Sequence, residues 1–206
     1  MSLHELSVQI ERTDLPPHVE AFLKVADQSC DRFFEEGNNR RFPRFIPADY
    51  ELVYSALLEL QNNHHLLGNR FCEWGSGLGT ATCLASMLGF EAYGLEIEQP
   101  LLERARQLAE SNQIEANFLD QSFLPEGYHF FEMQGGRELG KPRDNHPPSY
   151  EDVEWTLEEV DIFYVYPWPE EQQATLDLFD SVAADGAYLI CYFSEGEICI
   201  YRKELD

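Results

Sequence analysis

The stretch from Glu73 to Thr80 combines an acidic residue with three glycines at alternate positions. It follows an apolar run that predicts a β-strand, and it precedes residues that predict a helix. Glycine allows the backbone to turn sharply and lets a ligand approach it closely. A helix N-terminus adds free N–H groups and a partial positive charge. These residues therefore have the chemistry to hold a small, nucleotide-like ligand against the turn.

Two further acidic residues follow the next two apolar runs along the chain. Glu96 ends the run that begins at Ala92, and Asp120 ends the run that begins at Ala116, with Gln121 directly behind it. A carboxylate at such a position can accept hydrogen bonds from both hydroxyls of a ribose. The carboxyl ends of parallel strands meet at one edge of a sheet, where open α/β sheets bind their ligands. We therefore expect the acids after three successive strands to face one site.

The spacing of the glycines separates two kinds of ligand-binding turn. A dinucleotide fingerprint requires G-x-G-x-x-G, but Thr80 stands at the third glycine position, which disfavours a nicotinamide-dependent oxidoreductase. The spacing G-x-G-x-G, with Glu73 two residues before Gly75, resembles motif I of class I S-adenosylmethionine-dependent methyltransferases. The resemblance implies an enzyme that uses S-adenosyl-L-methionine. The implied cofactor-binding residues are Glu73, Gly75, Ser76, Gly77, Gly79, Glu96, Asp120 and Gln121.

The resemblance also implies what each part of this site does. The glycine turn packs against the amino-acid part of the cofactor, and Glu73 lies near its ammonium group. Glu96 binds the ribose, and Asp120 lies beside the adenine amino group. We expect no metal site, because the neighbouring His64 and His65 have no third ligand nearby in the sequence and indicate a solvated helix end.

Three aromatic residues, Tyr164, Tyr166 and Trp168, follow or end the fourth predicted strand. In the resembled family this edge faces the transferred methyl group and its acceptor. Amino-methyltransferases of the adenine and glutamine type carry an Asn/Asp-Pro-Pro-aromatic element here, so Tyr166 argues against methylation of a base or an amide. We predict that the three residues are catalytic and line the acceptor pocket, where they can bind a cation or shield the sulfonium. The alternative is that Tyr166 and Trp168 only cap the sheet.

The segment from Arg44 to Tyr50 resembles a Tyr-Val-Pro-type element of compact protein-lysine methyltransferase-like proteins. The acceptor would then be a protein lysine amine or a small molecule. A lysine must lose a proton before it accepts a methyl group, and an apolar pocket lowers its pKa by desolvation. A different class of function stays open, in which the protein binds S-adenosylmethionine without its own catalysis and acts through a basic partner.

The elements that position these residues alternate between strand and helix from residue 69 onward. Such alternation predicts βαβ units and an α/β fold: a mostly parallel, Rossmann-like methyltransferase sheet with a C-terminal antiparallel hairpin. We expect an N-terminal helical segment at 1–66 and an S-adenosylmethionine-binding domain at 67–206. A long insertion at 121–159 is either a lid or a plain flexible connection. The predicted strands are 70–74, 92–96, 116–120, 160–166, 187–193 and 197–201, and the predicted helices are 15–34, one beginning near 47, 81–88, 100–111 and 170–182.

The composition narrows the range of partners. The 206 residues include 14 Lys and Arg against 38 Asp and Glu, a net charge of −24. Such a chain repels phosphate backbones and anionic membranes, so we expect neither nucleic acid nor membrane as a partner. A basic protein or a small molecule is favoured, although acidity can also serve solubility alone. The charge says nothing of the oligomeric state.

The cysteines and the chain start indicate the compartment. The number of cysteines is five, which is odd, and no two have C-x-x-C spacing. Four lie among apolar neighbours, which is typical of small buried residues in a reducing environment. The sequence shows neither a secretory signal nor an apolar run long enough to span a membrane. We therefore expect a cytoplasmic location.

Overall fold

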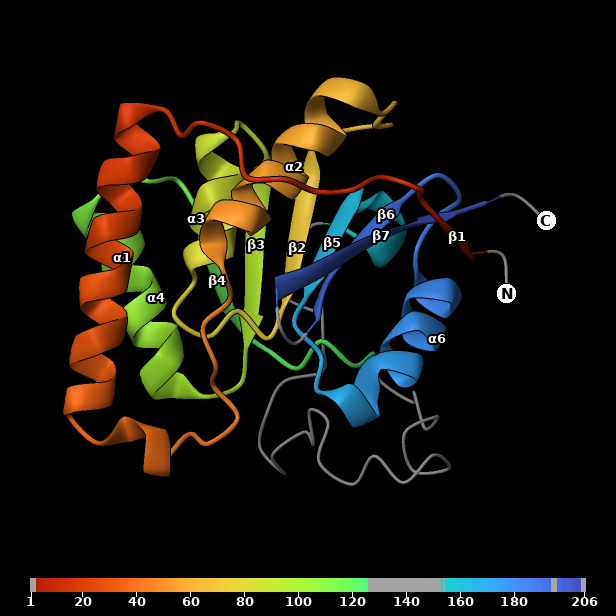
Figure 1. Ribbon diagram of the computed structural model, residues 1–206. Helices are drawn as coiled ribbons and strands as arrows, with labels where there is room; N and C mark the ends of the chain where they lie inside the picture. The colour runs from red at the N-terminus through yellow and green to blue at the C-terminus, as the bar shows by residue number, and fades with distance from the viewer. Residues whose placement is uncertain (1–2, 126–152, 154, 194–195, 205–206) are drawn as a thin grey trace.

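A twisted sheet forms the centre of the computed structural model, which describes residues 3–125, 153, 155–193 and 196–204 (Figure 1). Within these residues the sheet has seven strands in the order β1-β7-β6-β5-β2-β3-β4. Strands β2 to β6 are mutually parallel, β7 is antiparallel to β6, and β1 is antiparallel to β7. The strands are β1 (Leu3–Glu5), β2 (Arg70–Trp74), β3 (Glu91–Glu96), β4 (Asn117–Asp120), β5 (Ile162–Val165), β6 (Tyr188–Phe193) and β7 (Glu197–Lys203). The predicted parallel sheet with its C-terminal hairpin is confirmed.

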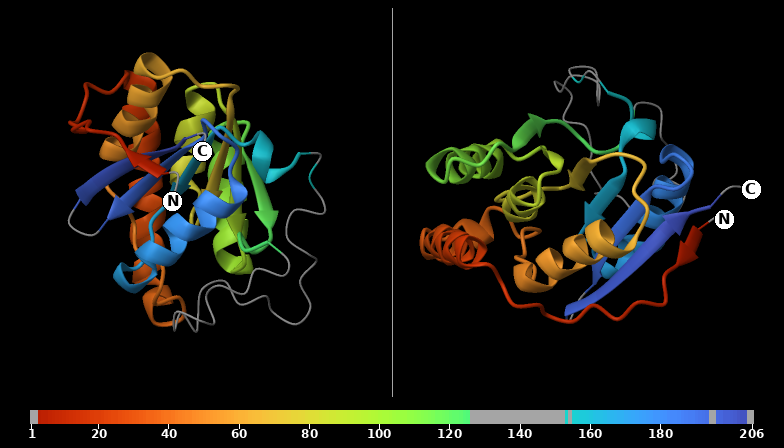
Figure 2. Two further views of the ribbon diagram at one scale, coloured as in Figure 1. Left: turned by 90° about the vertical axis from the view of Figure 1, so that its right-hand side faces the viewer. Right: turned by 90° about the horizontal axis from the view of Figure 1, so that it is seen from above.

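Helices cover both faces of the sheet (Figure 2). One apolar core joins the sheet to α1, α2, α3 and α4, and a second core joins the opposite face to α6. None of the helices in the described ranges is both long and apolar enough to cross a membrane. The helices are α1 (Pro17–Glu35), α2 (Tyr50–Asn63), α3 (Thr80–Met87), α4 (Gln99–Ser111) and α6 (Gln172–Val182), and the 3-10 turns are η1 (Asn38–Arg40), η2 (Leu157–Glu159) and η3 (Pro169–Glu171).

The order of the strands creates a crevice in the middle of the sheet. The chain runs outward from β2 through β3 to β4 and then returns to β5 on the other side of β2. The connections that leave the carboxyl ends of β2 and β5 therefore diverge. In open α/β sheets such a switch point is where ligands bind.

The differences from the sequence-based elements have local causes. The strand β1 was not predicted, because three residues are too short to show a period, and its partner β7 lies at the other end of the chain. The strand expected at 160–166 is shorter at both ends: the 3-10 turn η2 precedes it, and Pro167 follows it. The helix expected at 170–182 begins as the 3-10 turn η3. The part of the insertion at 126–152 lies outside the described residues, and with it the choice between lid and connection.

All five cysteines are free in the structure. Cys72, Cys83 and Cys191 are buried, whereas Cys30 and Cys199 are partly buried. Burial raises the pKa of Cys30 and of Cys199 to about 11 in each case. These two thiols are therefore protonated at neutral pH. Of the four cysteines that the sequence predicted to be buried, Cys72, Cys83 and Cys191 are buried, whereas Cys199 is only partly buried.

The last glycine of the motif turn, Gly79, is required by packing as well as by backbone conformation. It precedes α3 with φ of +79°, which is a left-handed conformation. A Cβ atom at this position would lie 2.5 Å from the ring of Phe118 in β4 and 2.7 Å from Cβ of Ala105 in α4. Gly79 therefore allows the start of α3 to approach the neighbouring strand and helix.

We expect Gly79→Ala to lower the free energy of unfolding by about 3 kcal/mol, since it adds overpacking to backbone strain. The matched control is Gly89→Ala, because Gly89 has φ of +89° but a Cβ there would meet nothing within 4 Å. The control should cost only about 1 kcal/mol from strain. Urea denaturation of both variants measures the difference, and equal costs would contradict the packing role.

Candidate functional site

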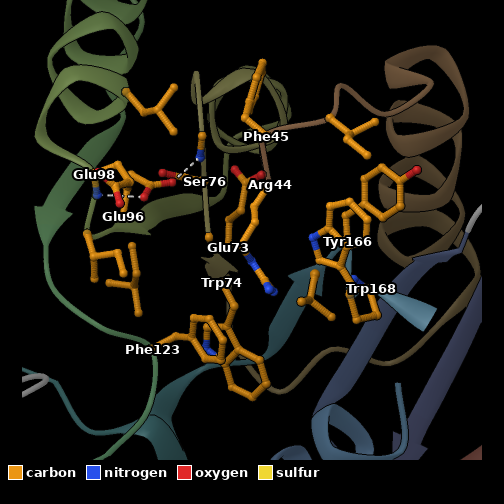
Figure 3. Close-up of a pocket in the computed structure, with 18 of the residues that line it drawn as sticks. Arg44, Phe45, Glu73, Trp74, Ser76, Glu96, Glu98, Phe123, Tyr166 and Trp168 are labelled. Carbon is orange, nitrogen blue, oxygen red and sulfur yellow. Dashed lines mark hydrogen bonds between the residues drawn. The ribbon is translucent and has the colours of Figure 1, made fainter. Parts of the chain in front are cut away.

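A cavity of about 520 Å³ opens at the carboxyl ends of β2, β3 and β5 (Figure 3). Its opposite wall comes from residues 41–46, from Ala48 and from Tyr50, the first residue of α2. The loop and the glycine turn are in close contact, because a Cβ atom on Gly77 would lie 2.7 Å from the ring of Phe45. The volume suits a small-molecule ligand. Of the predicted site residues, those that line the cavity are Glu73, Gly75, Ser76, Gly77, Glu96, Gln121, Tyr164, Tyr166 and Trp168.

The glycine turn offers polar atoms to the cavity. The amides of Gly75 and Ser76 donate to the carbonyl oxygen of Leu95 at 3.0 and 2.8 Å, which ties the turn to β3. A Cβ atom on Gly75 would meet nothing within 4 Å, so its backbone is open to a ligand. The hydroxyl oxygen of Ser76 is buried and has no hydrogen-bond partner among the described residues. A buried polar atom of this kind needs a partner, which a polar ligand would supply.

Glu96 is held in place by the backbone. Its Oε2 accepts a hydrogen bond from the amide of Gly77 at 2.8 Å, and its Oε1 accepts one from the amide of Glu98 at 2.8 Å. Burial raises the pKa of Glu96, while these backbone hydrogen bonds act in the opposite direction. Each carboxylate oxygen can accept about two hydrogen bonds, so both retain capacity for a ligand hydroxyl.

Glu73 lies deeper, at the end of β2, and only 5% of its surface is exposed. Its Oε2 accepts hydrogen bonds from the amide of Thr82, at 2.9 Å, and from the hydroxyl of the same residue. Burial raises the pKa of Glu73 to about 8, although the hydrogen bonds from Thr82 lower it. The carboxyl is thus largely protonated at neutral pH, and a cation that enters the cavity would favour its ionised form.

Two of the predicted cofactor-binding residues do not line the cavity. Gly79 serves the packing of α3 described above. Asp120, at the end of β4, pairs in register with Glu96 and accepts a hydrogen bond from the side chain of Gln99. Its neighbour Gln121 does line the cavity, so this strand end still borders the site. No group of three or more His, Cys, Asp or Glu side chains within the described ranges is arranged to hold a metal ion.

The predicted aromatic residues form the wall of the cavity beyond β5. The rings of Tyr166 and Tyr192 pack edge to face, with centroids 4.7 Å apart. The hydroxyl of Tyr164 is buried without a hydrogen-bond partner in the described structure, and burial raises its pKa well above the ordinary value. The guanidinium of Arg44 lies 5.6 Å from the ring of Trp168, so a cation of the chain itself already contacts this wall.

Several lining residues were missed by the sequence analysis. Trp74 and Phe123 stack with centroids 5.6 Å apart and an interplanar angle of 16°, and both line the cavity. Arg44 forms an ion pair with Glu171, which is 127 residues further along the chain. Arg44 belongs to the segment that resembled a lysine methyltransferase element, but no local pattern indicates a partner so distant.

The raised pKa of Glu73 makes stability depend on pH. The group has an ordinary pKa of 4.5 in the unfolded chain and about 8 in the folded protein. The folded state therefore binds more protons between these values, and its stability falls as the pH rises from 4.5 to 8. The Glu73→Gln variant stays neutral and lacks this loss.

We expect the unfolding free energy of Glu73→Gln, relative to the wild type, to rise by on the order of a few kcal/mol between pH 5 and pH 8. Chemical denaturation at both pH values measures it. The control is Glu110→Gln, which removes an exposed carboxylate from α4 and should show no such change. A pH-independent difference for Glu73→Gln would mean that the Glu73 carboxyl has an ordinary pKa.

Comparisons with known proteins show the fold. No protein-family model matches the chain, and no curated protein matches its sequence. An RNA methyltransferase from Salinibacter ruber, solved with S-adenosyl-L-homocysteine, is similar in structure, with a TM-score of 0.54 and 16% identity over 78% of this chain and 95% of that chain.

Two further solved structures have lower TM-scores. The ribosomal protein L11 methylase from Lactobacillus delbrueckii subsp. bulgaricus has a TM-score of 0.49 and 12% identity over 75% of this chain and 78% of its own. The S-adenosylmethionine-dependent methyltransferase from Thiobacillus denitrificans, solved with S-adenosyl-L-homocysteine, has a TM-score of 0.45 and 17% identity over 71% of this chain and 49% of its own. This chain thus spans about half the length of the Thiobacillus protein. The Salinibacter structure shows the fold: this chain has a Rossmann-like α/β fold like that of the Salinibacter methyltransferase.

Proposed function

We propose that this protein is an S-adenosylmethionine-dependent methyltransferase. The observation that carries the proposal is the convergence of Glu73, Glu96 and the open glycine turn on one cavity at the switch point of the sheet. When bound, S-adenosylmethionine supplies a methyl group on a positively charged sulfonium. The fold alone would not justify this function, because one fold hosts many chemistries.

The two halves of the cofactor have different chemical needs, and the cavity offers both. Glu96, with its oxygens fixed by backbone amides, is suited to the ribose hydroxyls. The turn at Gly75, Ser76 and Gly77, together with Glu73, is suited to the amino-acid part and its ammonium. We assign the adenine to the end of β4, where Gln121 lines the cavity and Asp120 lies in register with Glu96.

The aromatic wall is our proposed acceptor site. Methyl transfer needs alignment of the reacting groups and exclusion of water more than it needs a strong acid or base. Tyr164, Tyr166 and Trp168 would position the acceptor and exclude water. The same apolar surroundings would lower the pKa of an acceptor amine and so favour its reactive neutral form.

We propose a protein lysine amine or a small molecule as the acceptor. The Salinibacter protein is an RNA methyltransferase, but this chain has a net charge of −24, which opposes binding to a phosphate backbone. Five free cysteines accord with work in a reducing compartment, and we propose the cytoplasm.

Turnover with labelled S-adenosylmethionine and cell extract tests the catalytic assignment. We expect the double variant Tyr166→Ala/Trp168→Ala to lose on the order of 100-fold in the rate of transfer, because the acceptor loses its alignment. Binding of S-adenosylhomocysteine should change little. The control is Tyr201→Ala, which removes an aromatic ring of the same sheet that does not line the cavity.

An unchanged rate in the double variant would remove Tyr166 and Trp168 from the catalytic site. If the wild type binds the cofactor but transfers no methyl group to any component of the extract, the protein is a binding module without catalysis.

A further inference from the structure

Arg44 links the two sides of the cavity. It comes from the loop before α2, where 42% of its side-chain surface is exposed, and it forms an ion pair with the buried carboxylate of Glu171 in η3. Its guanidinium also contacts the ring of Trp168. Figure 3 shows Arg44 between Glu73 on one side and Tyr166 and Trp168 on the other. A guanidinium in this place can meet a ligand as well as Glu171.

The charges around the cavity are unbalanced. Among the described residues, the ionisable side chains that line it are four acids, of which Glu73 is largely protonated, and two arginines: Glu73, Glu96, Glu98, Glu171, Arg41 and Arg44. The amino-acid part of S-adenosylmethionine carries an ammonium and a carboxylate. An acidic cavity suits the ammonium, but a carboxylate that leaves water among these acids needs a cationic partner.

Arg44 is better placed for that carboxylate than Arg41. The guanidinium of Arg41 lies over the ring of Phe42, 5.2 Å from its centroid, within its own loop. Arg44 instead reaches across the cavity to residues that follow β5. A guanidinium has five N–H donors in a planar fork that matches a carboxylate, so two carboxylates can compete for it.

We propose that Arg44 exchanges partners: it pairs with Glu171 in this structure, and it pairs with the carboxylate of S-adenosylmethionine in the complex. The inference rests on the proposed function. Because the two carboxylates compete, the ion pair with Glu171 reduces the affinity for any ligand that carries the amino-acid part, and it leaves other ligands of the cavity unaffected.

Calorimetric titration with two probes tests the exchange without any turnover. S-adenosylhomocysteine has the amino-acid part, and 5′-deoxy-5′-(methylthio)adenosine lacks it. We expect Arg44→Gln to weaken binding of S-adenosylhomocysteine at least tenfold and to leave the affinity for methylthioadenosine unchanged. We expect Glu171→Gln to strengthen binding of S-adenosylhomocysteine several-fold, since it removes the competitor. The double variant should behave like Arg44→Gln.

A purely structural ion pair gives a different pattern. Either single substitution would then weaken the binding of both probes, and this result would overturn the proposed exchange. A selective loss of S-adenosylhomocysteine in Arg41→Gln, with Arg44→Gln unaffected, would also overturn it. Retained binding of methylthioadenosine shows in each variant that the protein is folded. A wild type that binds neither probe would refute the proposed function itself, which separates that failure from a failure of the exchange.

Discussion

The burial of two carboxylates at the switch point of the sheet is the constraint on which the rest of the site depends. A buried carboxylate is costly unless hydrogen bonds compensate for the lost water or a proton neutralises it. Glu96 takes the first solution, through the amides of Gly77 and Glu98, and thereby connects the end of β3 to the glycine turn. Glu73 takes the second in part, since its pKa is raised to about 8, and its hydrogen bonds with Thr82 connect the end of β2 to α3. These contacts hold the turn together with the hydrogen bonds from the amides of Gly75 and Ser76 to Leu95.

Much of the fold could be predicted because its signals are local. The alternation of apolar strands and amphipathic helices indicated the parallel sheet, and the glycines between β2 and α3 indicated where a ligand would bind. The strand β1 could not be predicted, because it is defined by pairing with β7 rather than by its own pattern. The ion pair of Arg44 with Glu171 and the stack of Trp74 on Phe123 depend on contacts across the assembled sheet, and nothing in either local sequence indicates its partner.

The glycines of the motif are required for two different reasons, ligand access at Gly75 and close packing at Gly79. Gly75 is open on the side where a Cβ atom would point, which is what a ligand in contact with the backbone requires. Gly79 is enclosed by Phe118 and Ala105, so its small size serves the packing of α3 against β4 and α4. One part of the glycine-rich turn can therefore contact a ligand, while another part allows neighbouring elements to pack closely.

We propose that the cavity at the carboxyl ends of β2, β3 and β5 binds S-adenosylmethionine, with Glu96 on the ribose. Calorimetric titration of S-adenosylhomocysteine into the wild type and into Glu96→Ala tests this proposal. The control is Glu103→Ala, because Glu103 is an exposed acid on α4. We expect one binding site in the wild type and an unchanged affinity in the control. The affinity of Glu96→Ala should fall roughly 10- to 100-fold, because the ribose hydroxyls lose hydrogen bonds to a charged acceptor. No binding to the wild type, or equal binding to Glu96→Ala, would contradict it.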